Sequence, residues 1–316
     1  MVLNRRLILC LTSALAMTAC TPRISNSFNT DNHEIDHIVG GTVVSSADPL
    51  SKSIVGLYIK NRVTQEIETC TGSLLPNNLV LTAAHCVSDL DGAVDVVVIF
   101  APNIDLKSFV LSQTRRVDNK VVARWWGAKD HETVDTGDIA LLHYQGTTPK
   151  GYVPATVLTD PGTLSDGMQV VLAGYGTTKV TKKPIDVNSF PDLIGAIQQG
   201  IVICENSIDL KNCFEISLEG RGPLRQTKVT ISEAVYSTSE FSVNQNRGSG
   251  SCHGDSGGPA YVVRGGRYYL VGVTSRTIND TFSDCSHQAV YTSLPFYANW
   301  LKAATNKLLN IVTQTK

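Results

Sequence analysis

Short runs in which apolar and polar residues alternate recur along most of the chain. Examples are 54–59 (Ile-Val-Gly-Leu-Tyr-Ile), 94–100 (Val-Asp-Val-Val-Val-Ile-Phe) and 168–173 (Met-Gln-Val-Val-Leu-Ala). A repeat of two is the side-chain period of a β-strand, and turn residues separate the runs. Because strands do not alternate regularly with helices, the pattern predicts an all-β sandwich or barrel.

The length and composition of the chain fit one large folded domain or two small ones. Of 316 residues, 42% are hydrophobic and 17% are charged, which is ordinary for a globular protein. The formal net charge of −1 gives no electrostatic reason to expect nucleic acid or an anionic membrane surface as a partner.

Residues 1–19 have the layout of an export signal. Arg5 and Arg6 precede an apolar run, 7–16, that is shorter than the ~20 residues of a membrane span. The following residues, 20–37, are polar and poor in aromatic side chains, so we expect them to form a linker or pro-segment.

The end of the signal is similar to the lipobox of bacterial lipoproteins. Residues 15–20 read Leu-Ala-Met-Thr-Ala-Cys, with Met17 where leucine is usual. Cys20 is therefore the predicted lipidation site, and cleavage after Ala16 to a soluble product is the alternative. We expect an exported bacterial protein that is extracellular, periplasmic or held at the outer membrane, with a lipid on Cys20 as its only membrane attachment.

The cysteines suit an exported chain. Apart from Cys10 and Cys20, the chain contains an even number of cysteines, which suggests disulfides. None of these residues has the close pair spacing of a zinc site, so we expect no metal and no cofactor. They are Cys70, Cys86, Cys204, Cys213, Cys252 and Cys285.

Ser256 lies in a stretch that is unsuited to a helix interior or a regular strand. Residues 250–259 read Gly-Ser-Cys-His-Gly-Asp-Ser-Gly-Gly-Pro. Glycine permits positive φ, and proline fixes φ and lacks a donor. The expected tight turn can expose a hydroxyl and direct several backbone N–H groups to one point, as a serine hydrolase requires. An ordinary surface turn is the alternative.

Two upstream segments add residues of the same chemistry. Residues 79–86 (Leu-Val-Leu-Thr-Ala-Ala-His-Cys) carry an apolar strand into His85, and residues 138–142 (Asp-Ile-Ala-Leu-Leu) place Asp138 at the start of a buried strand. Taken singly, His85 could be a core histidine and Asp138 a cap at a strand edge.

Together these segments resemble the trypsin/chymotrypsin family of serine endopeptidases. The matching pieces occur in the order of the family and reach from residue 38 nearly to the end of the chain. They are 38–41 (Ile-Val-Gly-Gly), 82–86 (Thr-Ala-Ala-His-Cys), 138–141 (Asp-Ile-Ala-Leu), 174–176 (Gly-Tyr-Gly), 254–259 (Gly-Asp-Ser-Gly-Gly-Pro), 271–275 (Val-Gly-Val-Thr-Ser) and 295–300 (Pro-Phe-Tyr-Ala-Asn-Trp).

The resemblance implies two antiparallel six-stranded β-barrels and a C-terminal helix, with the active site in the cleft between the barrels. The implied peptidase domain is 38–316. Within it, the first barrel is about 38–155, the second about 156–295 and the helix about 295–312.

The resemblance also implies a monomeric serine endopeptidase that cleaves proteins or peptides through an acyl-enzyme, in the mechanism for which this family is the standard example. Ser256 is the nucleophile, His85 the general base, and Asp138 the residue that orients the imidazole. The backbone N–H groups of Gly254 and Ser256 form the oxyanion hole, and Ser275 supports Asp138.

Two other readings use the same residues. Residues 254–258 also fit the Gly-x-Ser-x-Gly elbow of α/β-hydrolase esterases, with Asp284 and His287 downstream. Pro259 opposes the helix that this fold requires after the serine. The second alternative is an inactive binding module of the protease fold, although such modules usually lack a member of the triad and this chain has all three.

Residues 38–41 imply that the chain is a zymogen. In the family, cleavage before Ile38 frees an ammonium group that pairs with the acid preceding the serine, here Asp255. His37 stands where trypsin-activated relatives have arginine or lysine, so the activating protease is unknown. Cleavage would also separate the catalytic domain from a lipid on Cys20.

The resemblance implies three disulfides. The first closes the histidine loop, the second braces the substrate pocket, and the third lies within an enlarged loop, 177–223. For the third, the alternative is the later helix-loop bridge of the family. The common bridge at the positions of Val170 and Val262 is absent. The implied pairs are Cys70–Cys86, Cys252–Cys285 and Cys204–Cys213.

The family's primary specificity pocket maps to three positions. Gly250 falls at the floor, where trypsin-like members have aspartate, and Thr277 and Ala289 fall at the walls. We therefore expect small or medium uncharged residues before the cleaved bond. Three basic side chains could instead favour acidic residues if they reached the pocket: Arg276, His253 and His287.

Overall fold

The computed structural model describes residues 38–88, 94–105, 107–126, 135–206, 208–278, 280–282 and 284–314. The predicted signal segment, Cys20 and the linker lie outside these ranges. No helix within them combines the length and the apolar character needed to cross a bilayer.

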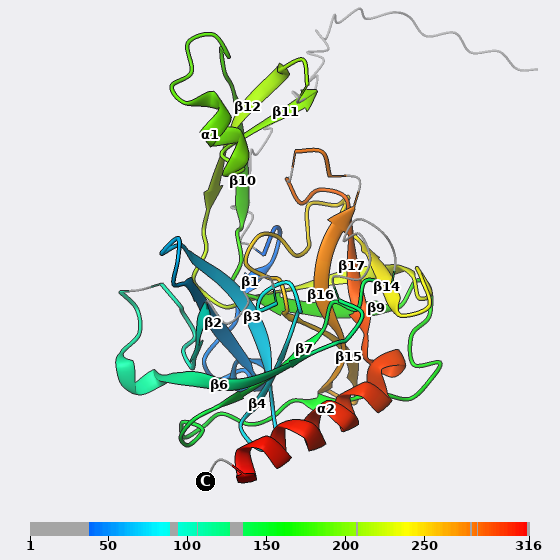
Figure 1. The fold of residues 1–316 in the computed structure, drawn as a ribbon. Coiled ribbons are helices and arrows are strands. Elements are labelled where there is room, and N and C mark those ends of the chain that lie inside the picture. The colour runs from blue at the N-terminus through cyan, green and yellow to red at the C-terminus, as the bar shows by residue number, and fades with distance from the viewer. Residues whose placement is uncertain are drawn as a thin grey trace, which may run out of the picture. The chain divides into compact units, whose positions relative to one another are not determined.

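The first barrel is a closed ring of antiparallel strands in the order β2-β3-β4-β7-β6-β5 (Figure 1). Leu57 and Ile59 of the predicted strand are buried, whereas Lys60 is exposed. Closure pairs β2 with β5, so the ring has no free edge. The strands are β2 (Ile54–Asn61), β3 (Ile67–Leu75), β4 (Leu79–Thr82), β5 (Val94–Ile99), β6 (Thr114–Val122) and β7 (Ala140–Tyr144).

The second barrel closes in the same way, in the order β13-β14-β17-β16-β15-β9, with β9 returning to β13. Short strands β1 (Thr42–Val43) and β8 (Thr156–Val157) add to β13 and β16. The ring strands are β9 (Gln169–Gly174), β13 (Arg225–Glu233), β14 (Glu240–Asn244), β15 (Pro259–Arg264), β16 (Arg267–Ile278) and β17 (Gln288–Ser293).

Two closed six-stranded barrels are the predicted fold, which is therefore confirmed. The esterase alternative is wrong, because among the described strands only β8 and β16 pair in parallel. Val170 and Val262 stand at the positions of the family disulfide that this chain lacks. Both lie in the same buried apolar cluster of the second barrel.

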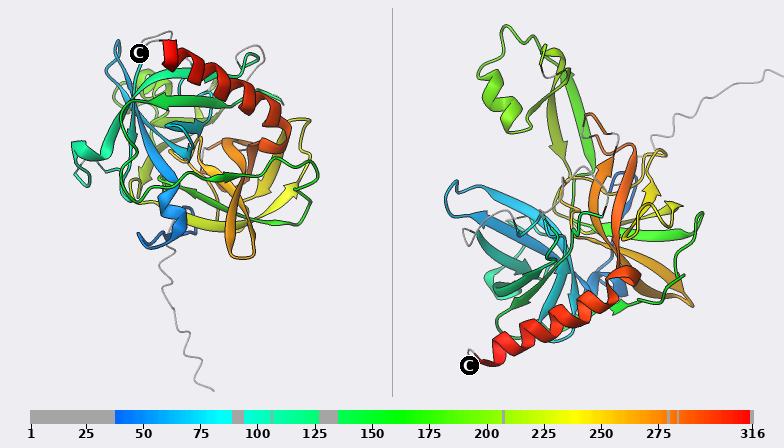
Figure 2. Two further views of the ribbon diagram at one scale, coloured as in Figure 1. Left: turned by 90° about the horizontal axis from the view of Figure 1, so that it is seen from below. Right: turned by 45° about the vertical axis from the view of Figure 1, so that its right-hand side comes forward.

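Helix α2 (Leu294–Gln314) begins directly after β17 of the second barrel and packs against β6 and β7 of the first (Figures 1 and 2). Its buried side chains include Tyr297 and Leu308, which belong to the apolar cluster of the first barrel. Trp125 Nε1 donates to the Tyr297 hydroxyl at 3.0 Å. The helix therefore ties the end of one barrel to the outside of the other. Two short 3₁₀ turns are η1 (Pro49–Lys52) and η2 (Leu111–Gln113).

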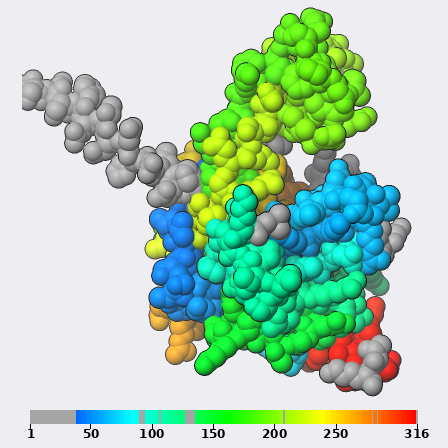
Figure 3. All heavy atoms as spheres, turned by 90° about the vertical axis from the view of Figure 1, so that its left-hand side faces the viewer, coloured from blue at the N-terminus to red at the C-terminus, as the bar shows by residue number. Residues whose placement is uncertain are grey.

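Residues 179–219 form a lobe outside both rings (Figures 1 and 3). Its sheet has the order β10-β12-β11, and α1 adds to its apolar cluster. Among the described residues of the lobe, the buried members of that cluster are Ala196, Val202 and Cys213. Cys204 lies opposite Cys213 in the register and is disulfide-bonded to it, with the Cα atoms 4.0 Å apart. The elements are β10 (Lys179–Pro184), α1 (Leu193–Gln198), β11 (Val202–Asn206) and β12 (Lys211–Glu219).

So small a core gives the lobe little stability of its own, and we expect the Cys204–Cys213 bond to supply much of it. In Cys204→Ala/Cys213→Ala, amide exchange in β11 and β12 should accelerate by the equivalent of roughly 2–3 kcal/mol. The thermal midpoint of the barrels should stay within about 1 °C. Exchange at wild-type rates in the lobe would contradict this assignment.

Candidate active site

His85 and Asp138 are neighbours because their strands pair. β4 ends at Thr82, which lies opposite Ala140 at the start of β7. The loop after β4 and the residues before β7 therefore leave the barrel side by side. His85 Nδ1 lies 2.8 Å from Asp138 Oδ2, and the His85 backbone N–H donates to Oδ1 at 3.0 Å. The carboxylate thus fixes both the ring and the backbone of the histidine.

Asp138 is held from the second barrel as well. Ser275 Oγ on β16 donates to Oδ2 at 2.6 Å, and Thr292 Oγ1 on β17 donates to the backbone carbonyl of Asp138 at 2.8 Å. Only 2% of Asp138 is exposed. Burial acts to raise its pKa, but the charge and hydrogen bond of His85 and the hydroxyl of Ser275 outweigh it, so the pKa lies below its usual range.

The loop that carries Ser256 is fastened to the first barrel through Thr71 on β3. The Thr71 N–H donates to the Ser256 carbonyl at 2.9 Å, and Thr71 Oγ1 donates to the Gly254 carbonyl at 2.9 Å. Thr82 Oγ1 in turn donates to the Thr71 carbonyl at 2.9 Å. Because Thr82 ends the strand that leads to His85, the same bonds connect the serine loop to the histidine loop. No sequence pattern singles out Thr71.

Glycine is required beside the serine. Gly254 and Gly257 have φ of +96° and +78°, in the left-handed region that other residues avoid. A Cβ on Gly257 would lie 2.0 Å from Thr82 Oγ1 and 2.5 Å from the Thr71 carbonyl oxygen. The backbone of the serine loop therefore sits directly on the first barrel.

Ser256 opens onto a hollow of about 230 Å³. Ser275 and Thr277 of the predicted site line it, whereas Gly250 and Ala289 are not among its lining residues. Ala289 is fully buried in the core of the second barrel. The hollow is lined by Ser251, Cys252, His253, Ser256, Thr274, Ser275, Arg276, Thr277 and Cys285.

Gln245, which the motifs do not reveal, occupies the space beside Gly250. A Cβ on Gly250 would lie 2.1 Å from Gln245 Cδ and Oε1. The fully buried amide accepts from the Ser251 N–H at 2.6 Å and donates to the carbonyls of Ser251 and Cys285, both at 3.1 Å. An uncharged amide thus fills the space beside Gly250, the position that the resemblance assigns to the pocket floor.

The basic residues near the hollow differ in what they contact. Arg276 makes a two-pronged ion pair with Glu240, at 2.7 and 3.1 Å, and Glu240 is 2% exposed. The guanidinium charge is therefore matched by a buried carboxylate. His253 lines the hollow and His287 is exposed.

Asp255 lies beneath the serine and is 1% exposed. Its oxygens accept from the backbone N–H groups of Gly176, at 2.8 Å, and Cys252, at 2.9 Å. Burial raises the pKa of Asp255 from 3.8 to about 7, although these N–H groups act to lower it. Ile38 is buried in the core of the second barrel, and Val39 bridges to Gly250.

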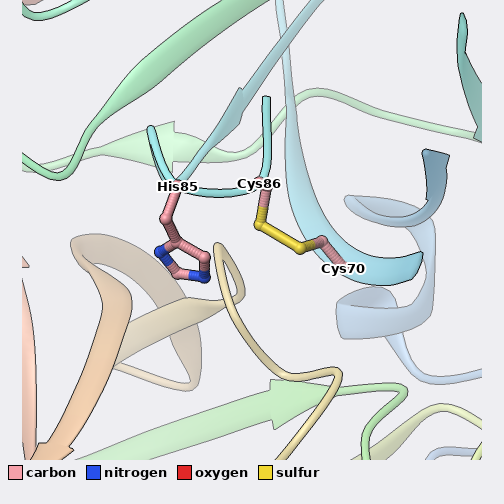
Figure 4. Close-up of side chains that lie close together, drawn as sticks. All are labelled: Cys70, His85 and Cys86. Carbon is pink, nitrogen blue, oxygen red and sulfur yellow. A yellow bond between two sulfur atoms is a disulfide. The ribbon is translucent and has the colours of Figure 1, made fainter. Parts of the chain in front are cut away.

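Disulfides join Cys70 to Cys86 and Cys252 to Cys285, the pairs that the resemblance implies. Figure 4 shows His85 and Cys86 leaving one loop, with the two sulfurs bonded to each other. Cys86 Sγ lies 3.7 Å from the Ser256 carbonyl oxygen, so the bridge also touches the serine loop.

Among the residues that the structure describes, three groups of side chains have donor atoms close enough to hold a metal ion: Cys70, His85 and Cys86; Cys252, His253 and Cys285; and Asp280, Asp284 and His287. In the first two groups the sulfurs are disulfide-bonded and offer no thiolate. In the third group, Asp280 accepts from the backbone N–H groups of Asp284 and Cys285. Each group thus has a structural role that needs no ion.

The comparisons with known proteins agree with one another. The model of the Trypsin family matches residues 38–191 and 214–301. The chain is 29% identical over 267 residues to chymotrypsin-like elastase family member 1 of Felis catus, covering 84% of this chain and 88% of that protein. For the protein of the same name from Homo sapiens, the identity is 29% over 239 residues, covering 74% and 80%.

Among solved structures, the fold is similar to that of HL collagenase. The TM-score is 0.60 at 17% identity, and the match covers 85% of this chain and 99% of that one. At this identity, the likeness concerns the fold alone.

Gly257→Ala should test how tightly the serine loop packs on the first barrel. Gly266 is the matched control, because its φ is +72° but nothing lies within 4 Å of its Cβ position. Gly266→Ala should cost about 1 kcal/mol of unfolding free energy from backbone strain alone. Gly257→Ala should cost roughly 2–3 kcal/mol more, because Thr82 and Thr71 must move. Urea denaturation measures both, and equal losses would contradict the packing.

The raised pKa of Asp255 predicts a pH dependence of stability in the uncleaved chain. Between about pH 4 and 7 the unfolded carboxyl is ionised while the folded one still binds its proton, so the unfolding free energy falls as pH rises. From pH 5 to 8 the fall due to Asp255 should be about 3 kcal/mol.

Denaturation of uncleaved Ser256→Ala protein, with and without Asp255→Asn, isolates this contribution. The Asn variant should lack that part of the fall. The same pH dependence in both proteins would show that Asp255 does not cause it.

Proposed function

We propose that this chain, which belongs to the trypsin family of serine proteases, is an active serine endopeptidase. It hydrolyses peptide bonds in proteins or peptides through an acyl-enzyme and needs no cofactor. The observation that carries the proposal is the buried Asp138 carboxylate, bonded at once to His85 Nδ1 and to the Ser275 hydroxyl. A buried charge held in this way orients an imidazole for proton transfer.

The proposed mechanism gives each residue one role. With Nδ1 bonded to Asp138, His85 uses Nε2 to accept the proton of Ser256 Oγ as the oxygen attacks the scissile carbonyl. Asp138 then stabilises the imidazolium. The backbone N–H groups of Gly254 and Ser256 bind the oxyanion, where loss of one donor typically costs about 3–4 kcal/mol of barrier. His85 returns the proton to the leaving amine, and water completes hydrolysis by the reverse steps.

We infer that the enzyme cleaves after small or medium uncharged residues. Gly250 provides no carboxylate for arginine or lysine, the Gln245 amide fills the space beside it, and Thr277 narrows the hollow. Arg276 is engaged by Glu240, which argues against a role for it in binding acidic residues. The similarity to proteins named elastases accords with this preference.

Activation is proposed to follow cleavage before Ile38. Asp255 is a buried carboxyl whose hydrogen-bond donors are neutral backbone groups, so a new ammonium group beside it would be strongly favoured. Ion pairing would lower the pKa of Asp255 and brace the serine loop from below.

An exported location is part of the proposal. Three disulfides are typical of proteins that fold in an oxidising compartment. A lipid on Cys20 would hold the precursor at a membrane, and cleavage before Ile38 would release the catalytic domain as a monomer.

The test is active-site labelling of chain cleaved before Ile38. A fluorophosphonate should label it once, on Ser256, and it should hydrolyse peptides with alanine or valine before the bond faster than peptides with arginine. Ser256→Ala should abolish labelling and lower kcat/KM by about 10⁴-fold or more. The control Ser165→Ala, at an exposed turn, should behave as the parent. Cleaved chain that resists labelling would instead be an inactive binding module.

A further inference from the structure

The lobe contacts the loop between β16 and β17, which forms one wall of the hollow beside Ser256. We propose that the lobe positions this wall, at Cys285, for substrate, and that Lys182 is the residue through which it acts. The inference rests on the proposed peptidase function, because the wall matters only if a substrate side chain enters the hollow.

Lys182 on β10 makes two contacts with the loop. Its ammonium lies 2.7 Å from Asp284 Oδ2 and 4.6 Å from the centre of the Phe282 ring. The side chains of Lys182 and Asp284 are 34% and 19% exposed, so the ion pair is partly shielded from water. At a partly exposed site, such an ion pair and a cation–π contact are each modest in strength.

Phe214 on β12 adds a third contact. Its ring meets that of Phe282 edge to face, with the centroids 5.3 Å apart. Successive strand residues point to opposite faces, so Cys213 faces the lobe core and Phe214 faces the loop. The second face of the small sheet therefore contacts the loop between β16 and β17.

The wall residue next to Asp284 needs to be held. Cys285 has φ of +61°, a left-handed backbone conformation that strains a non-glycine residue. Its N–H donates to Asp280, its carbonyl accepts from Gln245, and its sulfur is bonded to Cys252. Asp280 thus holds Cys285 from within the loop, Gln245 and Cys252 hold it from the second barrel, and the lobe contacts the adjacent Asp284.

The ion pair between Lys182 and Asp284 should persist throughout the neutral pH range. Burial acts to raise the pKa of Asp284, but the hydrogen bonds from Lys182 and Ser286 and the charge of Lys182 prevail and lower the pKa to about 2. The carboxylate is thus ionised at any pH at which a peptidase with a catalytic histidine works. The lobe acts as a constant brace and not as a pH switch.

The lobe is an addition to the family pattern. The Trypsin match stops at 191 and resumes at 214, so the tip of the lobe lies outside it, while Lys182 and Phe214 lie just inside its limits. The residues that contact the wall therefore lie at the base of the lobe, next to the part that the match leaves out.

The test compares Lys182→Met, which removes the charge but keeps most of the length, with Lys183→Met and Lys182→Arg. Lys183 is the next residue and is exposed. In full-length Ser256→Ala protein, the amides of 284–286, which donate to Asp280 and Asp284, should exchange about fivefold faster after Lys182→Met. Lys183→Met should leave them unchanged, and Lys182→Arg should keep most of the protection.

In active, cleaved enzyme, Lys182→Met should raise KM for a peptide amide about fivefold and change kcat by less than about twofold. Labelling of Ser256 by a phosphonate that has no side chain for the hollow should keep its rate. KM of the parent should rise with salt from 0.05 to 1 M, whereas KM of Lys182→Met should not.

Exchange or KM at parent values in Lys182→Met, or equal changes in Lys183→Met, would overturn the inference. A parent enzyme that fails to react with the phosphonate would instead refute the proposed peptidase function. The exchange measurement does not need activity, so it reports on the contact between the lobe and the wall in either case.

Discussion

One buried negative charge at the seam between the barrels governs the arrangement of the site. The carboxylate of Asp138 cannot stay ionised in the interior without partners, because an uncompensated buried charge costs several kcal/mol. Its partners come from both barrels: His85 from the first, and Ser275 from the second. Thr71 of the first barrel makes a further link between the barrels, because its hydroxyl donates to the Gly254 carbonyl in the serine loop of the second barrel. The candidate site is therefore a property of how the barrels dock, and neither barrel contains it alone.

The sequence was informative about the fold and the candidate site where a short segment carries a recognisable pattern of residues. The alternating runs mark strands, and Ser256, His85 and Asp138 stand in segments whose composition has few other uses. It did not reach Thr71, Gln245 or the Arg276–Glu240 pair. These residues stand in ordinary strand or loop sequence, and their importance arises from partners far away in the chain. The lobe could be predicted from the sequence as an insertion with its own disulfide. Its contacts with Phe282 and Asp284 could not, because they join residues far apart in the chain and no local pattern encodes them.

Two buried side chains, Gln245 and Asp255, fill the space around the serine loop. The neutral amide of Gln245 occupies the space beside Gly250 and donates to the carbonyls of Ser251 and Cys285, which line the hollow. Asp255 lies on the other side of the same loop with two backbone donors and a pKa near neutrality. The charges of Arg221 and Arg225 act to lower that pKa, but burial outweighs them. In the proposed function, Gln245 would influence specificity and Asp255 would influence activation.

The bond between Thr292 and Asp138 spans 154 positions of the chain. During synthesis, a nascent chain that has passed His85, Asp138 and Ser256 already holds every reactive group but lacks β17 and α2, which complete the seam. Without β17, the second ring is not closed and the backbone carbonyl of Asp138 lacks its bond from Thr292. The bonded surroundings of Asp138 are therefore complete only after the last strand of the ring has emerged, so the order of synthesis itself delays the assembly of the candidate site.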